Sequence, residues 1–501
     1  MRKTFIFGLA LLGFLSCTNS DQAPEKPNLL FIWTDQQQAA SMAVYGNEII
    51  QTPNLNQLAD QSFVFRNAYV SQAICTPSRS TIMTGLYPHQ NGCMGNGDPL
   101  DEKYRCLPRL LENGYHSAYM GKWHLGDEIF QQHGFDEWVS IEDHYYNSFS
   151  EGRDRSTRSD YHQFLLDQGY EPTDKEENVF SRKFAVSLPI EHCKPKFLEL
   201  QAIDFLERNQ ENPFVLYVNF LEPHNPFSGP LNDLHPRDEI PLPPNFDDPI
   251  DENEPLLYQV LQEDCRATFG ESEEEIRELT GKYWGLISQV DRSTGAILDK
   301  LKELGLDENT IVIYTSDHGE MMGAHGLVRK EVNYEEAIRV PWLMRVPWLK
   351  KKQEIKNYPV SHIDLVPTLL DLMGSEIPQE LPGKSLTGYM KGGAVPEDMV
   401  FIEWAPRSKG RYKKLKYDRS AYDPDELENA FNNSSRCVLS PDGFKLTVSR
   451  GDKSFLFDLN EDPLETTNVI GEEFYAPVVE ELFNEILEWQ KRTGDTLSLV
   501  L

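Results

Sequence analysis

Positively charged residues are scarce in this chain of 501 residues. Lys and Arg number 48 against 80 Asp and Glu, which gives a formal net charge of −32. A protein that binds nucleic acid needs a basic surface, so this composition argues against DNA or RNA as a partner. It leaves room for a small anionic substrate, because a local basic pocket can lie inside an acidic shell.

The cysteines are too few and too uneven in number to form a complete disulfide framework. Seven occur, and two of them, Cys17 and Cys75, lie in motifs that give them other roles. The remaining five are an odd number, so they cannot all pair with one another. One or two disulfides remain possible in an oxidising compartment.

An apolar run at the N-terminus, residues 5–15, is too short to span a bilayer and follows the positive pair Arg2-Lys3. This is the pattern of an export signal. The run ends at Leu15-Ser16-Cys17, which resembles a bacterial lipoprotein signal in which Cys17 becomes the lipidated N-terminus; a plain signal peptide with a chance cysteine is the alternative. We expect an exported protein, in the periplasm or at the outer membrane, with a lipid anchor as its only membrane attachment.

Four short apolar runs, rich in β-forming residues, are each followed by polar residues capable of chemistry. Their continuous hydrophobicity predicts strands buried on both faces, as in a parallel sheet covered by helices. Ligands of such sheets bind outside the carboxyl ends of the strands, so the four polar ends predict one shared site. The runs are 28–33 before Asp35-Gln36, 115–120 before Gly121 to His124, 213–220 before Glu222 to His224, and 309–315 before Asp317-His318.

The pattern changes near residue 396, where short predicted strands follow one another with turns between them and a helix closes the chain. The expected fold is therefore α/β: a large mixed, mostly parallel sheet sandwiched by helices, with a smaller C-terminal antiparallel sheet plus helix. The predicted units are a signal peptide at 1–17, a linker at 18–26, a catalytic domain at 27–395 and a C-terminal subdomain at 396–501.

The most specific signal is the segment Cys75-Thr76-Pro77-Ser78-Arg79, with Thr84-Gly85 after it. It resembles the C-x-P-S-R signature of the formylglycine-dependent sulfatases, which belong to the alkaline-phosphatase-like superfamily. Further elements resemble the family in the same order: Thr52 to Leu55, Gly121 to His124, and Asp462-Pro463. In that family a formylglycine-generating maturation enzyme oxidises the cysteine to 3-oxoalanine, so the resemblance implies this partner and this modification at Cys75.

The resemblance implies a covalent mechanism at position 75. One hydroxyl of the hydrated aldehyde attacks sulfur, and the other then loses its proton, so that the aldehyde re-forms and sulfate leaves. An unmodified thiol has no second hydroxyl, so it could not release the sulfate in this way. The alternative for Cys75 is a buried structural cysteine.

The resemblance also implies a calcium ion at the strand ends, held by Asp35, Gln36, Cys75, Asp317 and His318. These ligands are mainly oxygen atoms, as a hard cation prefers. Many relatives carry a second Asp at position 36 and Asn at position 318. Fewer carboxylates here predict weaker calcium binding and a more positive metal site, whereas either aspartate alone would more simply be a turn or helix cap.

Cationic residues take the remaining roles that the resemblance implies. Arg79 and Lys122 would stabilise the formylglycine oxygen and the sulfate, and His124 would deprotonate the hydrate during sulfate release. His224 would protonate the leaving alcohol, and Lys330 would bind sulfate, a role for which its arginine neighbour competes. Charge aimed at oxygen atoms is usually the largest catalytic contribution, and His serves as acid or base near neutral pH.

Two segments bear on the substrate. The basic stretch 407–419 contains Tyr412, Lys413, Lys414 and Lys416, which are candidates for a subsite that binds further sulfates or sugar faces; a solvated loop is the equal alternative. The polar segment 142–193 is predicted to be an insertion that shapes the cleft.

Together with the export signal, these features favour a sulfatase acting on glycans from sulfated polysaccharides, either algal (ulvan or carrageenan) or glycosaminoglycan. Two other functions remain open at this stage. One is a phosphoester or phosphonate hydrolase on the same scaffold, and the other is a non-catalytic lipoprotein that binds sulfated glycans.

Overall fold

The computed structural model describes residues 24–112, 114–143, 145–173, 182–350, 352–395, 398–406 and 412–501. The predicted signal peptide with Cys17 and most of the linker lie outside these residues. Within the described ranges, no helix has the length and apolar character needed to cross a membrane. All six cysteines in these ranges are unpaired, so the disulfides that the sequence left possible are not formed there.

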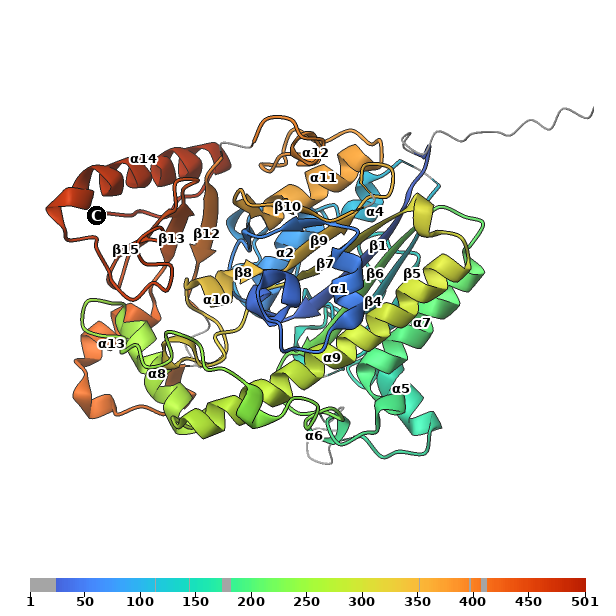
Figure 1. Ribbon diagram of the computed structural model, residues 1–501, viewed down its shortest axis with the longest axis horizontal. Helices are drawn as coiled ribbons and strands as arrows, with labels where there is room; N and C mark the ends of the chain where they lie inside the picture. Colours follow the sequence, from blue (N-terminus) through green and yellow to red (C-terminus); the bar gives the residue numbers. More distant parts are fainter. Residues whose placement is uncertain are drawn as a thin grey trace, which may run out of the picture.

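An eight-stranded sheet forms the centre of the molecule (Figure 1). One strand, β9, runs antiparallel to both of its neighbours, and every other neighbouring pair is parallel. The predicted mixed, mostly parallel sheet is confirmed. In spatial order its strands are β10 (Glu354–Lys356), β2 (Phe63–Phe65), β9 (Trp342–Arg345), β7 (Thr310–Ser316), β1 (Asn28–Asp35), β6 (Phe214–Pro223), β4 (His116–Gly121) and β5 (Glu137–Ser140).

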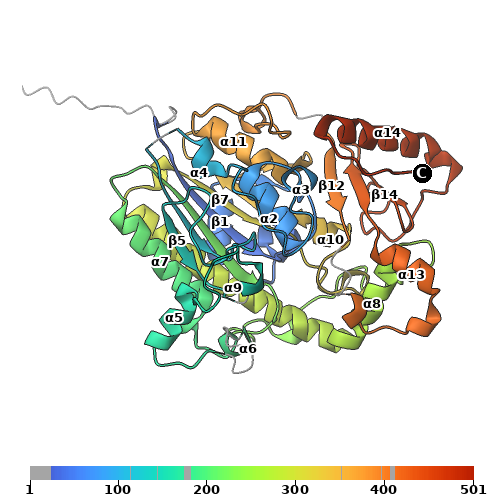
Figure 2. The same ribbon diagram turned by 180° about the vertical axis from the view of Figure 1, so that it is seen from behind.

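Side chains alternate along β1, and the two sets pack against different helical layers. Leu29, Phe31 and Trp33 belong to one core, and Leu30 and Ile32 belong to the other. Every residue of β1 is buried, which explains its continuous hydrophobicity, and each such apolar side chain contributes about 1.5–3 kcal/mol by burial. The first layer contains α2 (Cys75–Thr84), α4 (Leu107–Leu110) and α11 (Leu365–Leu372), seen over the sheet in Figure 2, and the second contains α1 (Pro53–Ala59), α7 (Lys194–Arg208) and α9 (Glu273–Glu303), seen over it in Figure 1.

A separate antiparallel sheet lies beside the main one and carries the C-terminal helix (Figure 1). Trp489 of that helix stacks on Phe401 of the sheet, with ring centroids 5.1 Å apart. The predicted smaller sheet plus helix is confirmed, whereas the boundary at 395/396 stays a prediction. The elements are β12 (Val400–Trp404), β13 (Ser435–Leu439), β14 (Phe444–Ser449), β15 (Phe455–Asp458) and α14 (Ala476–Thr493).

The four strands with polar ends lie side by side in the middle of the main sheet. Their order is β7-β1-β6-β4, and neighbours are parallel, so their carboxyl ends meet at one edge. Gly121 allows the end of β4 to approach β6. Its φ is 119°, and a Cβ atom there would lie 1.9 Å from the backbone oxygen of Asn219, so only glycine fits.

Candidate active site

Cys75 is the first residue of α2 and is almost completely buried. The partial positive charge of a helix N-terminus favours a negative group at this position. At the other end of the helix, Gly85 takes a left-handed conformation and donates its N–H to the carbonyl of Thr81. A Cβ atom at Gly85 would lie 3.0 Å from the side chain of Val366. Gly85 of the signature segment therefore ends the helix that presents Cys75, and its close contact with Val366 leaves no room for a larger residue.

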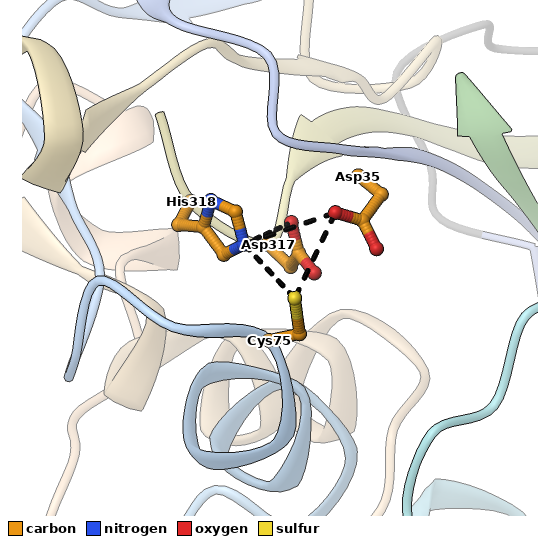
Figure 3. A group of neighbouring side chains, drawn as sticks. All are labelled: Asp35, Cys75, Asp317 and His318. Atoms are coloured by element: carbon orange, nitrogen blue, oxygen red, sulfur yellow. Dashed lines mark hydrogen bonds and ion pairs between the residues drawn. The ribbon is translucent and has the colours of Figure 1, made fainter. Parts of the chain in front are cut away.

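Cys75 lies among two carboxylates and an imidazole (Figure 3). Its Sγ is 3.2 Å from Nε2 of His318 and 3.9 Å from Oδ1 of Asp35. One ligand atom from each of Asp35, Cys75, Asp317 and His318 lies within 4.8 Å of all the others, and all four residues are buried. Buried carboxylates so close together need a compensating positive charge, so these residues fit a metal site.

Arg79 connects the two carboxylates from one turn further along α2. Its Nη2 donates to Oδ2 of Asp35 at 2.8 Å, and its Nε donates to Oδ2 of Asp317 at 2.9 Å. Nη1 donates to the carbonyl of Lys122 at 2.7 Å and to Oδ1 of Asn219 at 2.8 Å. Each nitrogen of the guanidinium thus has an acceptor within the protein, and the planar fork fixes both carboxylates.

The positive charges act unequally on the two carboxyl groups. Burial and Cys75 would raise the pKa of Asp35, but Lys122, His224 and Arg79 hold it well below its usual value. Lys122 makes this contact directly, through an ion pair between its Nζ and Oδ2 of Asp35. Burial and the neighbouring Asp35 instead raise the pKa of Asp317 to about 6. A divalent cation between the two groups would offset their repulsion and keep both ionised.

The same cations act on Cys75 itself. Burial would raise the pKa of its thiol, but Lys122, Lys330 and His318 outweigh burial and hold the pKa well below its usual value. These groups would equally stabilise a negatively charged oxygen at position 75 or an anionic ester bound beside it.

His124 is held in a left-handed conformation, with φ 60°, by contacts at both ends of its backbone. Glu128 is buried and accepts the N–H groups of Trp123 and His124, one on each carboxylate oxygen. Thr76, next to Cys75, donates its hydroxyl to the carbonyl of His124 at 2.8 Å. Burial and Lys122 lower the pKa of His124 to about 4, so its ring is neutral at neutral pH and is able to accept a proton.

His224 is the second neutral imidazole of the site. Burial and Lys330 lower its pKa to about 3. Its Nδ1 lies 2.7 Å from the carbonyl oxygen of Asn225. The role that the sequence predicted for His224, that of an acid, therefore depends on a bound anion, which would raise its pKa.

The loop after β7 brings Lys330 to the site and places Arg329 away from it. Lys330 donates through Nζ to Oε1 of Gln36, whose Nε2 donates to Glu320 at 2.5 Å. Arg329 instead contacts Asp264 at 3.4 Å, and its guanidinium carbon lies 4.7 Å from the ring centre of Phe269. Of the two neighbours, Lys330 is the one that reaches the site.

The basic stretch is described only from residue 412 onward, and nothing is described of the Lys413 side chain. The ring of Tyr412 is buried and stacks on Phe431, with centroids 4.6 Å apart. Lys414 and Lys416 are exposed. The backbone N–H of Lys416 donates to Asp264, the residue that also contacts Arg329, so the stretch adjoins the loop of Lys330. Its substrate-binding role stays a prediction.

The structure thus gathers Asp35, Cys75, Arg79, Lys122, His124, His224, Asp317, His318 and Lys330 in one region, and Gln36 joins it through Lys330. Sequence reasoning missed Asn219 and Glu128. Asn219 left a signal, because it is a polar residue inside the apolar strand β6. Glu128 gave no signal in the sequence, because the groups that it binds are backbone N–H groups, which every residue type except proline carries.

A mostly parallel α/β sheet with a buried carboxylate and imidazole cluster at its carboxyl edge is the arrangement of alkaline-phosphatase-like hydrolases. The chain belongs to the sulfatase family: the sulfatase model matches residues 27–375, and the model of the N-sulphoglucosamine sulphohydrolase C-terminal region matches residues 323–492. It is therefore a sulfatase-family enzyme, in the class of sulfuric ester hydrolases.

Similar proteins cover nearly the whole chain. An N-acetylglucosamine-6-O-sulfatase of Bacteroides thetaiotaomicron is 26% identical, over 98% of this chain and 91% of the relative. An ulvan-active sulfatase of Formosa agariphila is 28% identical, over 97% of this chain and 86% of the relative. The solved structure of a phosphonate monoester hydrolase from Silicibacter pomeroyi has a TM-score of 0.76 at 23% identity, and the match covers 93% of this chain and 96% of that one.

Proposed function

We propose that the chain removes sulfate from glycans derived from sulfated polysaccharides, algal or glycosaminoglycan, by means of a formylglycine made from Cys75. The observation that carries this proposal is the placement of Cys75 at a helix N-terminus, beside two buried carboxylates and near Lys122 and Lys330. The names of the two curated relatives support a carbohydrate substrate. The proposal requires a formylglycine-generating maturation enzyme as a partner.

A divalent cation is part of the proposal, with calcium as the expected ion. Asp35 and Asp317 would hold it through carboxylate oxygens, which calcium prefers. Gln36 donates its backbone N–H to Oδ1 of Asp317, and its amide oxygen accepts from Lys330, so its role as a ligand stays a prediction. His318 offers a nitrogen, a donor that also suits manganese or zinc. When bound, the cation supplies positive charge that orients the sulfate and the group at position 75.

Side chains of the protein bind the sulfate, position the carboxylates and transfer protons. Lys122 and Lys330 supply the positive charge for the sulfate oxygens, and Arg79 acts by holding the two carboxylates in place. Formylglycine would supply a hydrated aldehyde with one hydroxyl to attack sulfur and a second to release the sulfate. Neutral His124 accepts a proton near position 75. His224 donates a proton to the leaving alcohol once the bound anionic ester has raised its pKa.

The test is a matched pair of substrates given to protein that has been co-expressed with the maturation enzyme. A 4-nitrophenyl sulfate and a 4-nitrophenyl phosphonate share a leaving group and differ in the transferred group. We expect hydrolysis of the sulfate, and release of sulfate from at least one member of a panel of defined sulfated oligosaccharides. The likeness to a phosphonate monoester hydrolase makes phosphonate hydrolysis the second candidate activity, and a clear preference for the phosphonate would replace the first.

The proposal extends to location. The charged pair Arg2-Lys3, the apolar run 5–15 and Cys17 support export as a lipoprotein. Labelling of expressing cells with a fatty acid should mark the protein, and Cys17→Ser should abolish the label. A protein that is exported and cleaved without the label would carry a plain signal peptide.

A further inference from the structure

A pocket lies beside His224 that the reaction described above does not use. Its lining includes Arg182, Lys194, Glu222 and Gln289. Arg182 begins the short helix α6 (Arg182–Ala185), and Lys194 begins α7; both elements lie in the half of the molecule that contains α5 (Asp160–Asp167), on the side away from the C-terminal sheet (Figure 2). Arg182 belongs to the polar segment 142–193 that the sequence marked as an insertion shaping the cleft, and Lys194 follows directly after that segment.

Two cations of this pocket share a single carboxylate. Nε of Arg182 donates to Oε2 of Glu142 at 2.7 Å, and Lys194 forms an ion pair with Oε1 of the same residue. Burial would raise the pKa of Glu142, but Arg182 and Lys194 hold it well below its usual value, so it is ionised. The group of three therefore carries one excess positive charge.

Arg182 is the cation that a ligand can reach. Its side chain is 20% exposed, against 3% for Lys194 and none for Glu142. Nε and Nη2 are engaged by Glu142 and by the hydroxyl of Tyr145, whereas Nη1 has no partner among the described residues. A guanidinium with a free edge at a pocket is a binding group for sulfate or carboxylate.

The pocket also contains an acceptor without a donor. Oε2 of Glu222 is buried and has no hydrogen-bond partner in the described part of the chain. A buried polar atom left in this state is destabilising, and a hydroxyl group of a ligand would satisfy it. Glu222 stands two residues before His224, so a sugar that donates to it would lie next to the imidazole.

We propose that Arg182 recognises a second anionic group on the sugar that carries the leaving oxygen. The pocket has a free volume of only about 30 Å³, so it admits one substituent of that sugar and not the whole ring. The inference rests on the proposed function, since it takes His224 as the acid that faces the leaving alcohol. It narrows the substrate class to saccharides with a sulfate or carboxylate close to the sulfate ester that is cleaved. Glu222 accepts a hydroxyl group of the same sugar.

The test compares Arg182→Gln with the parent, both matured. Lys194 keeps Glu142 paired in this variant, so no buried carboxylate is left alone. The substrates are a disaccharide with one sulfate, the same disaccharide with a second sulfate, and a third that has a uronate carboxylate in place of the second sulfate. We expect the parent to prefer at least one dianionic substrate, and Arg182→Gln to reduce that preference in kcat/KM about tenfold, mainly through KM. The two dianionic substrates show which anion the pocket takes.

Tyr145→Phe is the matched control. Arg182 donates to the hydroxyl of Tyr145, and the ring centre of Tyr145 lies 4.2 Å from that of His124, so loss of Arg182 could disturb His124 through this tyrosine. This variant breaks that contact but keeps the guanidinium, so it should retain the preference for the dianionic substrate. An equal loss on all three substrates in Arg182→Gln, or a parent without preference for a second anion, would overturn the inference. A matured parent that cleaves no sulfate ester at all would refute the proposed function instead.

Discussion

Arg79 and Asp317 form a fully buried ion pair that ties α2 to the end of β7, with Nε and Oδ2 2.9 Å apart. The guanidinium reaches Asp35 at the same time, a geometry that a lysine is unable to reproduce. We expect Arg79→Lys to lower the free energy of unfolding by about 2–3 kcal/mol, since at least one buried charged hydrogen bond is lost. Urea unfolding measures this, with exposed Arg66→Lys as the control; equal loss in both variants would contradict the interpretation.

Metal removal should abolish activity, and calcium should restore it. Asp317→Asn should be far more damaging than Gln36→Asn, because a charged ligand contributes more than a neutral one and because Lys330 and Glu320 already engage the amide of Gln36. Titration of the chelated protein with calcium, manganese and zinc measures both effects. Restoration by manganese or zinc but not by calcium would assign the site to a transition metal, as the nitrogen of His318 allows.

Glu128 should matter for turnover although it does not reach the substrate. Glu128→Gln replaces one acceptor oxygen by an amide donor, so the N–H of either Trp123 or His124 loses its partner. The expected result is a fall in kcat of about tenfold with KM nearly unchanged, because the base is displaced while sulfate binding remains. Glu112→Gln, on the surface, is the control. A change in KM alone would assign Glu128 to another role.

The pH dependence of kcat should report the neutral state of His124, because this base acts in the release of sulfate, after the alcohol has left. Burial and Lys122 lower its pKa to about 4, so the base form is present at all higher pH values and is lost as the pH falls through about 4. A bound cation would lower this pKa further. 4-Nitrophenyl sulfate is the appropriate substrate, since its leaving group needs no proton from His224. An acid limb near the ordinary pKa of histidine would show that the ring is not in the environment described here.

The sequence predicted the main fold and the meeting of the polar strand ends because both depend on local patterns, whereas Cys75, Arg79 and Lys330 were named from the family resemblance. The run at 28–33 is continuous in hydrophobicity because β1 is covered on both faces, and Asp35 and Asp317 follow adjacent parallel strands, so their approach follows from the topology. Asn219 was missed although it interrupts an apolar strand. Whether Arg329 or Lys330 reaches the site depends on the path of the loop after β7, and hydrophobic periodicity does not predict the path of a loop.

The contacts of the inserted segment could not be predicted either. Arg182 and Lys194 are far from Glu142 in the sequence, and their ion pairs depend on how α6 and α7 return to the sheet. Nothing in the residue types distinguishes these cations from solvated ones. The basic stretch near Lys416 differs from Arg182 and Lys194, because its charges stood out in the sequence whereas theirs did not.

The central claim is that Cys75 becomes the catalytic aldehyde, and the mass of the peptide that contains it tests this most directly. After co-expression with a formylglycine-generating enzyme, that peptide should show the mass loss of thiol-to-aldehyde conversion. The converted fraction should rise in proportion to sulfatase activity across preparations, and Cys75→Ala should be inactive. Full activity in preparations whose Cys75 peptide keeps the mass of an unmodified thiol would contradict the account.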